Sequence, residues 1–190
     1  AVPVVGGAVT IYEEPFDSDL GATFGFSIIG AQVWEWADFG LPAGCSKMSG
    51  FDGSAMENED WLITNAIDCD GYENITLSFD HARNYGANSQ LFVLISNDYD
   101  GSSDPNTSGT WTDISSSFTF PSGGWDFIDA GSLDISAYVG STTYVAYKYT
   151  SDNSDAATWE VDNITVEGDL NFSVFVAGSF NDWTSDSVDY

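Results

Sequence analysis

The chain has 190 residues, and its 30 Asp and Glu against three Lys and Arg give a formal net charge of −27. Nucleic-acid-binding proteins present a basic face to phosphate, and anionic membrane surfaces repel an acidic protein, so we expect neither kind of partner. The sequence has no run of about 18 apolar residues, so we expect no membrane insertion.

The acidity is not of the kind that disordered chains show. Acidic disordered segments lack aromatic residues, whereas this chain has seven Trp, nine Tyr and 13 Phe and is 43% hydrophobic. The composition is typical of a folded β protein outside the cell, so we predict that the protein is secreted or lies on the cell surface. A hard divalent cation, Ca²⁺ above all, would relieve so many carboxylates.

The repeating pattern is the alternation of apolar and polar residues that strands show, and helical periodicity is almost absent. Clusters of Gly, Asp, Asn, Ser and Pro between the alternating segments are typical of turns. The predicted strands lie at 8–14, 32–36, 45–49, 61–67, 73–81, 90–96, 110–119, 125–130, 142–150 and 158–167. Short, numerous strands predict an all-β fold, an antiparallel β-sandwich of the jelly-roll type.

Two units are predicted along the chain. The pattern changes after Gly168, so we predict a jelly-roll, adhesin-like domain over 1–168. Residues 169–190 would then form an extra strand or the start of a truncated next domain. The two cysteines, Cys45 and Cys69, either form a disulfide or stay as free buried thiols.

An ordered set of short motifs runs through the first unit: Glu14-Pro15-Phe16-Asp17, Gln32-Val33-Trp34, Asn58-Glu59-Asp60-Trp61-Leu62-Ile63 and Thr158-Trp159-Glu160-Val161-Asp162. Over residues 10–168 this set resembles the choice-of-anchor J domain. That family is related to the cleaved-adhesin and MAM-like jelly rolls of secreted and surface proteins of Bacteroidetes-type bacteria. The resemblance implies a jelly roll, structural Ca²⁺ and a role in adhesion or glycan binding.

The C-terminal segment carries a second resemblance. Residues 174–183 are similar to the first strand of the immunoglobulin-like starch- and glycogen-binding modules. Only that strand is present, and a lone strand with an apolar face could instead complete the sheet of another subunit. Self-assembly through 170–190 is therefore also expected.

The resemblance and the chemistry of carboxylates together indicate a calcium site. Glu14, Asp17 and Asp162 match the positions where related jelly rolls bring their first and last strands together. Asn58 and Asp60 stand just before the predicted strand that begins at Trp61, and they could be further ligands to the same ion or to a second one. Since Ca²⁺ takes about six to eight oxygen ligands, these side chains and backbone carbonyls would suffice. The alternative is that they are solvated edge or loop residues.

Aromatic residues indicate a glycan-binding surface, because sugar rings stack on Trp and Tyr while polar groups bind the hydroxyls. Trp34 and Trp36 share one face of a predicted strand, Tyr99 lies in a loop and Trp125 lies beside a Gly-rich turn. We predict these four residues as ligand-binding, and the alternative is that they belong to the core.

Catalysis has little support in the sequence. The chain has a single histidine, His81, and no Gly-x-Ser-x-Gly motif, and pairs of carboxylates are inevitable among 30 acidic residues. We therefore predict a non-catalytic, calcium-stabilised extracellular module that binds a glycan or a cell-surface protein. The alternatives are a structural subunit or repeat of a surface filament or adhesin and, third, a polysaccharide-degrading enzyme.

Overall fold

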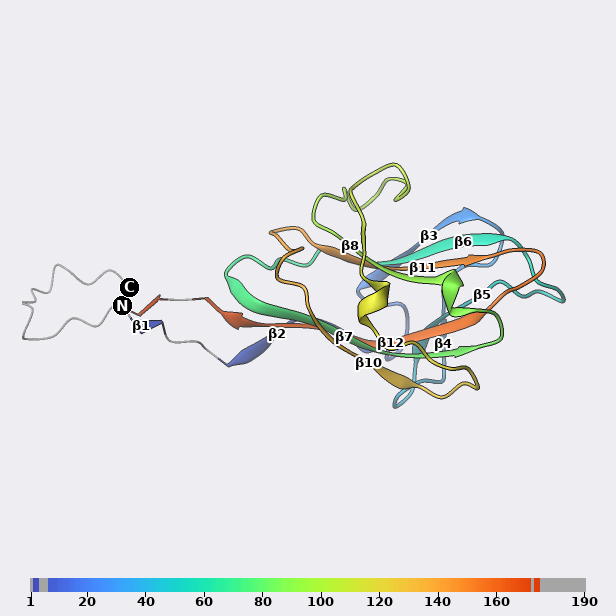
Figure 1. The fold of residues 1–190 in the computed structure, drawn as a ribbon, viewed down its shortest axis with the longest axis horizontal. Coiled ribbons are helices and arrows are strands. Elements are labelled where there is room, and N and C mark those ends of the chain that lie inside the picture. The colour runs from blue at the N-terminus through green and yellow to red at the C-terminus, as the bar shows by residue number, and fades with distance from the viewer. Residues whose placement is uncertain (1, 4–6, 172, 175–190) are drawn as a thin grey trace, which may run out of the picture.

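The computed structural model describes residues 2–3, 7–171 and 173–174, and two antiparallel sheets face each other in it (Figure 1). The first, here the β12 sheet, contains in spatial order β10 (Ile128–Asp134), β7 (Tyr72–Asn84), β12 (Thr158–Leu170), β5 (Cys45–Ser49) and β4 (Glu35–Ala37). A further strand, β2 (Ala8–Glu14), pairs with β12 beyond the end of β5. The second, here the β11 sheet, contains β3 (Thr23–Ile29), β6 (Asn58–Thr64), β11 (Tyr144–Ser151), β8 (Leu91–Ser96) and β9 (Thr112–Asp113).

This arrangement confirms the predicted all-β antiparallel sandwich. The described ranges contain two short 3-10 turns, η1 (Asn88–Gln90) and η2 (Ser115–Ser117). Within those ranges no helix has the length and apolar character needed to cross a membrane.

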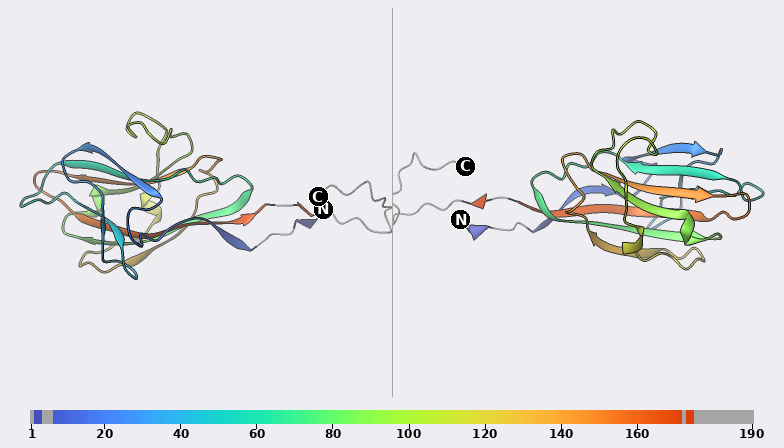
Figure 2. Two further views of the ribbon diagram at one scale, coloured as in Figure 1. Left: turned by 180° about the vertical axis from the view of Figure 1, so that it is seen from behind. Right: turned by 45° about the horizontal axis from the view of Figure 1, so that its top comes forward.

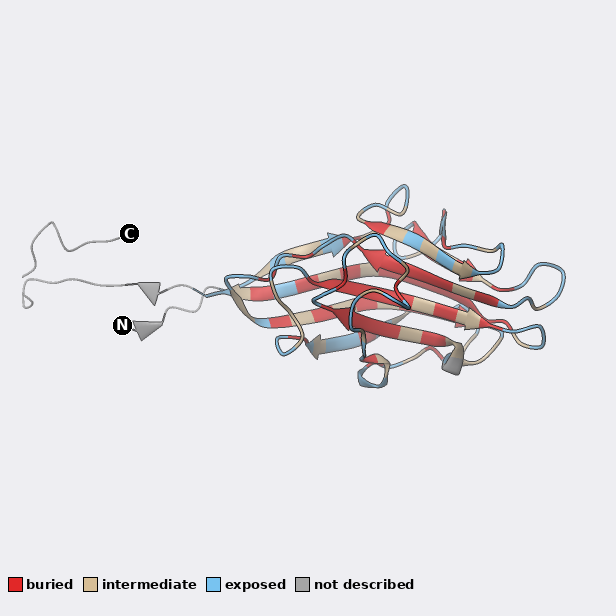
Figure 3. Ribbon diagram, turned by 90° about the horizontal axis from the view of Figure 1, so that it is seen from above, coloured by how far each residue is buried: buried red, intermediate tan, exposed pale blue. Residues whose placement is uncertain are grey.

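The main core lies between the two sheets, where every second residue of the long strands points inward. On β12 the inward residues include Trp159 and Val161, and on β11 they include Val145 and Tyr147, all fully buried. Figure 3 shows that buried positions concentrate in the long central strands. This core fixes the outer faces of both sheets, so residues next to the core positions in sequence must point outward.

A second apolar cluster covers the outer face of the β11 sheet. Trp61, Ile63 and Tyr144 are buried there, and Tyr99 and Trp111 from the 97–111 connection pack on them. The β11 sheet therefore has apolar contacts on both faces. This agrees with the two-faced apolar pattern of the segment that forms β8.

The predicted strands agree with the structure best in the long central elements, and β2 and β5 have the predicted bounds. Other segments differ. The segment 110–119 forms only β9 and η2, and the sequence pattern does not predict β3. The segments 32–36 and 125–130 form β4 and β10, each three residues later, and the segment 61–67 forms β6 three residues earlier. On β3 the aromatic residues Phe24 and Phe26 face outward opposite Ile63 and Trp61. The usual apolar-inward pattern is inverted on this edge strand.

The two cysteines are free, buried thiols rather than a disulfide. At the C-terminal end, β12 runs to Leu170, beyond the predicted boundary at 168. Past that end of the sandwich, β1 (Val2–Pro3) pairs with β13 (Ser173–Val174) (Figure 2). Residues 175–190 lie outside the described residues, so a separate unit over 169–190 stays a prediction.

Candidate functional site

Polar side chains lie in register across three strands on the outer face of the β12 sheet. Glu35 on β4 is opposite Lys47 on β5, and Lys47 is opposite Glu160 on β12. In the next outward-facing row, Ser49 is opposite Thr158, and their hydroxyl oxygens are 2.8 Å apart. The two-residue period of the strands thus gathers two carboxylates, an ammonium group and two hydroxyls on one surface.

Exposed aromatic side chains border this polar surface. Phe39, Phe51, Tyr85 and Trp125 come from loops around the sheet, and each is between 42% and 65% exposed. Trp125 has a left-handed backbone, with φ of 70°, and its ring packs edge-on against Tyr85 at 5.7 Å between ring centroids. Large aromatic groups left in water around a polar surface are a common mark of a binding site.

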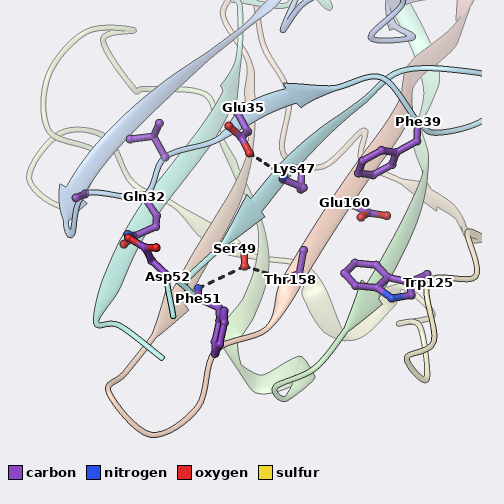
Figure 4. A pocket seen from close by; sticks show the side chains of 12 residues that line it. Gln32, Glu35, Phe39, Lys47, Ser49, Phe51, Asp52, Trp125, Thr158 and Glu160 are labelled. Carbon is purple, nitrogen blue, oxygen red and sulfur yellow. Dashed lines mark hydrogen bonds and ion pairs between the residues drawn. The ribbon is translucent and has the colours of Figure 1, made fainter. Parts of the chain in front are cut away.

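The polar side chains and three of the aromatic ones, Phe39, Phe51 and Trp125, line a groove of about 530 Å³, here called the Trp125 groove (Figure 4). Its lining residues are Ala31, Gln32, Val33, Glu35, Phe39, Lys47, Ser49, Phe51, Asp52, Trp125, Thr158 and Glu160. A hollow of about 390 Å³ shares Phe39, Trp125 and Glu160 with it, and another of about 630 Å³ shares Ser49, Phe51 and Thr158. The groove therefore continues along the sheet in both directions.

The floor of the groove is acidic and only partly neutralised. The Lys47 ammonium is 2.7 Å from the Glu35 carboxylate. Burial raises the pKa of Glu160 to about 7, even though Lys47 acts to lower it. In Figure 4 the Glu160 carboxylate lies between Phe39 and Trp125. The groove can thus offer aromatic faces for stacking and hydrogen-bonding groups for hydroxyls.

Of the four residues predicted to bind a ligand, the structure places only Trp125 in this groove. Trp34 is buried against Trp159, with ring centroids 5.7 Å apart. Trp36 is partly exposed, and its indole N–H donates to the Phe16 carbonyl at 2.7 Å. Tyr99 is buried against Trp111 on the opposite sheet. The structure does not bring these three residues to Trp125.

Sequence reasoning missed Phe39, Phe51 and Glu160. A signal was available for the two phenylalanines, because each stands in a turn-like segment, Asp38-Phe39-Gly40 and Gly50-Phe51-Asp52-Gly53. An aromatic residue among turn residues is not needed for strand formation and is often exposed. No such signal marked Glu160, whose position follows from the registers of three strands.

On the other side of the sandwich, the outer face of the β11 sheet has a separate hollow of about 460 Å³, whose lining includes Trp61, Trp111 and Lys148. The Lys148 ammonium is 2.9 Å from the Glu59 carboxylate and 4.8 Å from the centre of the Trp61 ring. The Asn106 amide also donates to Glu59, at 2.6 Å. Among the described residues, Lys148, the one charged residue in the lining of this hollow, is thus paired with Glu59, whereas Asp52 and Glu160 in the Trp125 groove make no ion pair, which favours the Trp125 groove as the candidate site.

His81, the single histidine of the chain, is fully buried and does not line the groove. The Trp159 indole N–H donates to its Nδ1 at 3.3 Å, so Nε2 carries the proton and donates to the Thr119 carbonyl at 2.8 Å. Both ring nitrogens are engaged in structural hydrogen bonds.

Of the three calcium ligands predicted at the first and last strands, Asp17 is exposed, and its charge contributes to raising the pKa of Asp162. The other two, Glu14 and Asp162, are engaged by backbone donors. Glu14 accepts hydrogen bonds from Phe16 N, at 2.7 Å, and from Ala22 N. Asp162 is fully buried and accepts from Leu41 N at 2.7 Å and from Asn163 N at 2.8 Å. Burial raises the pKa of Asp162, while these two donors act to lower it. Both carboxylates are satisfied without an ion.

Asn58 and Asp60, the other predicted calcium ligands, differ in this respect. Both face inward on β6 and are only 2% and 1% exposed. The Asn58 amide oxygen and both Asp60 carboxylate oxygens are buried without a hydrogen-bond partner. Burial raises the pKa of Asp60 to about 6. The nearby Ser27 hydroxyl acts to lower this pKa, but it does not form a regular hydrogen bond with the carboxylate. In the described part of the chain, no group of three or more His, Cys, Asp and Glu is arranged to hold a metal.

Solved structures with this fold include adhesin domains. The K3 cleaved adhesin domain of Lys-gingipain from Porphyromonas gingivalis W83 superposes with a TM-score of 0.55 and 14% identity, covering 85% of this chain and 99% of the adhesin domain. The K1 cleaved adhesin domain of the same protein superposes with a TM-score of 0.53 and 16% identity, covering 85% of this chain and 98% of the K1 domain. The predicted resemblance to cleaved adhesins is thus confirmed for the fold, whereas the choice-of-anchor J assignment is not supported by these comparisons.

A carbohydrate-binding module has the same fold. TmCBM61, solved in complex with β-1,4-galactotriose, superposes with a TM-score of 0.50 and 8% identity, covering 83% of this chain and 97% of the module. No curated protein matches the chain in sequence. One family model does match, over residues 51–182, and it is described as a domain of unknown function, DUF5017. Because this match spans more than half of the sequence, the chain belongs to the DUF5017 family.

Proposed function

We propose that this domain is a non-catalytic carbohydrate-binding module of an extracellular adhesive protein, and that the Trp125 groove holds the glycan. The observation that carries the proposal is the pairing of exposed aromatic rings with a polar floor on one sheet face. Sugar rings present apolar faces to aromatic side chains and hydroxyls to carboxylates and hydroxyl groups. The shared fold of adhesins and a carbohydrate-binding module supports this function without identifying a ligand.

The charge of the groove favours a neutral glycan. Glu35, Asp52 and Glu160 line it together with a single cation, Lys47, and the whole chain carries a net charge of −27. A glycan that bears uronate or sulfate groups would be repelled at low ionic strength. We therefore expect neutral oligosaccharides to bind and their acidic counterparts to bind more weakly.

The test is a screen of neutral and acidic oligosaccharides, followed by calorimetric titration of Trp125→Ala. Loss of the indole should weaken binding at least about tenfold, because a central aromatic contact contributes more than about 1.4 kcal/mol. Leu170→Ala is the matched control, since Leu170 is similarly exposed but lies at the far end of β12. Unchanged affinity in Trp125→Ala would contradict the proposed groove.

A second variant tests on which outer face of the sandwich the glycan binds. Asn106→Ala alters the hollow on the β11 sheet and leaves the Trp125 groove intact. The proposal predicts unchanged affinity for this variant. Shortened oligosaccharides after long incubation with wild-type protein would show turnover and would contradict a non-catalytic module.

A further inference from the structure

The interior of the sandwich holds a carboxylate that no protein group neutralises. Asp60 faces inward from β6, opposite Ser27 on β3 and Tyr149 on β11. Neither of its carboxylate oxygens has a hydrogen-bond partner, although the residue is 1% exposed. A buried, unpartnered carboxylate is strongly unfavourable, so this site calls for a counter-charge.

No cationic side chain supplies that counter-charge, and the chain has only three Lys and Arg. Lys47 pairs with Glu35, and Lys148 pairs with Glu59 on the outer face of the sheet. Arg83 donates to the carbonyls of Tyr85 and Gly86. All three are committed elsewhere, and the acidic neighbour Glu59 makes the surroundings of Asp60 more negative.

The groups around Asp60 are rich in oxygen. Asn58, two residues earlier on the same inward face, has an amide oxygen that also lacks a partner. Its register neighbour is Ser151, whose hydroxyl donates to the Met56 carbonyl at 2.7 Å. Carboxylate, amide, hydroxyl and carbonyl oxygens are the ligands that Ca²⁺ takes.

We propose that Asp60 and Asn58 hold a calcium ion inside the sandwich, with hydroxyl and backbone oxygens of the adjoining segments completing its shell. The site is distinct from the one expected between the first and last strands, where backbone N–H groups engage Glu14 and Asp162. A single carboxylate gives a weak site, with a dissociation constant of about 10⁻⁴–10⁻³ M, as in extracellular calcium modules.

The position of the ion links it to the wall of the Trp125 groove. Gly30 is so close to Asn58 that an added Cβ would lie 1.8 Å from the amide oxygen, and the Trp34 indole N–H donates to the Asp60 carbonyl at 3.4 Å. The segment between Gly30 and Trp34 contributes Gln32 to the groove. An ion at Asp60 should therefore order this wall of the groove. Its effect on glycan affinity rests on the proposed function.

The test is thermal unfolding of the full chain after removal of metal with EDTA, followed by titration with CaCl₂ at fixed ionic strength. Wild-type protein should gain stability in a saturable manner, as linkage requires for an ion bound to the native state. Asp60→Asn removes the charge at nearly constant shape, so it should be more stable than metal-free wild type at pH 8 and should lose the response to calcium.

Two variants locate the ion. Asp100→Asn is the matched control, because Asp100 lies in an exposed acidic loop that has its own Asp-turn hydrogen bonds; it should keep the full calcium response. Asn58→Asp adds a second carboxylate and should tighten calcium binding about tenfold, which keeps the proposal testable should Asp60→Asn fail to fold.

Absence of a calcium response in wild type would overturn the proposal and would mean that a proton neutralises Asp60. A response that persists in Asp60→Asn would overturn it as well, because the ion would then lie elsewhere. None of these measurements contains a glycan, so their failure is distinguishable from failure of the proposed function.

Discussion

Single residues in this domain are held by neighbours that fix their chemical state, and His81 is the clearest case. Burial lowers its pKa to about 4, although the hydrogen bond to the Thr119 carbonyl acts to raise it. The Trp159 indole N–H occupies the other ring nitrogen, which would have to accept the incoming proton. Charging His81 must therefore break a buried hydrogen bond within the core.

The pKa of His81 is directly measurable, because the chain has no other histidine. We expect its imidazole proton signals in NMR to titrate with a pKa of about 4. In the unfolded chain the pKa is about 6.5, so the unfolded state binds more protons between these values. His81 therefore lowers the free energy of unfolding as pH falls from about 6.5 to 4, by up to about 3 kcal/mol. A titration near pH 6.5 in the folded protein would contradict this.

At the scale of an element, the connection from β2 to β3 is closed around a single carboxylate. Glu14 ends β2, and its side chain accepts hydrogen bonds from Phe16 N and Ala22 N. Gly21 lies against this carboxylate with φ of 52°, and an added Cβ would be 2.0 Å from its oxygen. The connection requires glycine there for both conformation and space.

We therefore expect Gly21→Ala to destabilise the domain by about 2 kcal/mol or more, because it combines left-handed strain with a clash. Gly25→Ala on β3 is the matched control, since nothing lies within 4 Å of its added Cβ. That variant should change the free energy of unfolding by less than about 0.5 kcal/mol. Urea denaturation of both proteins checks the difference, and equal midpoints would show that the connection relaxes freely.

The elements also show how far the sequence alone can predict this structure. The long strands β7, β11 and β12 were predicted because each must bury alternate residues in one core. Edge strand β3 was not predicted, because Phe24 and Phe26 face away from that core. Within the candidate site, Trp125 was predicted from its turn context, whereas Glu160 joins the groove only through strand registers. Such pairings link residues distant in sequence, and a single sequence does not encode them locally.

The whole molecule carries a large unbalanced charge that its fold must tolerate. With 30 acidic residues and three basic ones, most carboxylates have no cationic partner. Many exposed Asp side chains instead accept hydrogen bonds from nearby backbone N–H groups, as Asp100 and Asp152 do in their loops. These local bonds satisfy single carboxylates but do not reduce the long-range repulsion among them.

Salt should therefore stabilise the protein. Raising NaCl from 10 mM to 500 mM in the presence of EDTA should increase the free energy of unfolding by about 1–2 kcal/mol, because the repulsion is screened. For a domain of this size that gain corresponds to an increase of about 2–8 °C in Tm. Differential scanning calorimetry checks it, and a Tm independent of salt would mean that the charges are too widely spaced to interact.

Self-assembly through 170–190 is a prediction about the whole molecule that deletion can test. If the C-terminal segment completes the sheet of another subunit, removing residues 170–190 should convert any assemblies into monomers. Analytical ultracentrifugation of both chains provides the measurement. Assemblies that survive the deletion, or a monomeric full-length protein, would each contradict the prediction.

The pairing of β2 with β12 has a mechanical consequence. Ala8 at the start of β2 is opposite Asp169 near the end of β12, so the chain enters and leaves the sandwich at the same end. Tension between the two ends would therefore act along the hydrogen bonds of this antiparallel pair and open them one after another. Glu160 lies ten residues before Leu170, where β12 ends. At roughly 3.3 Å per residue, the two are about 33 Å apart along the strand. A glycan bound beside Glu160 would therefore stay bound while tension first separates β2 from β12. The end of the sheet that carries β2 would yield before the end that carries the glycan.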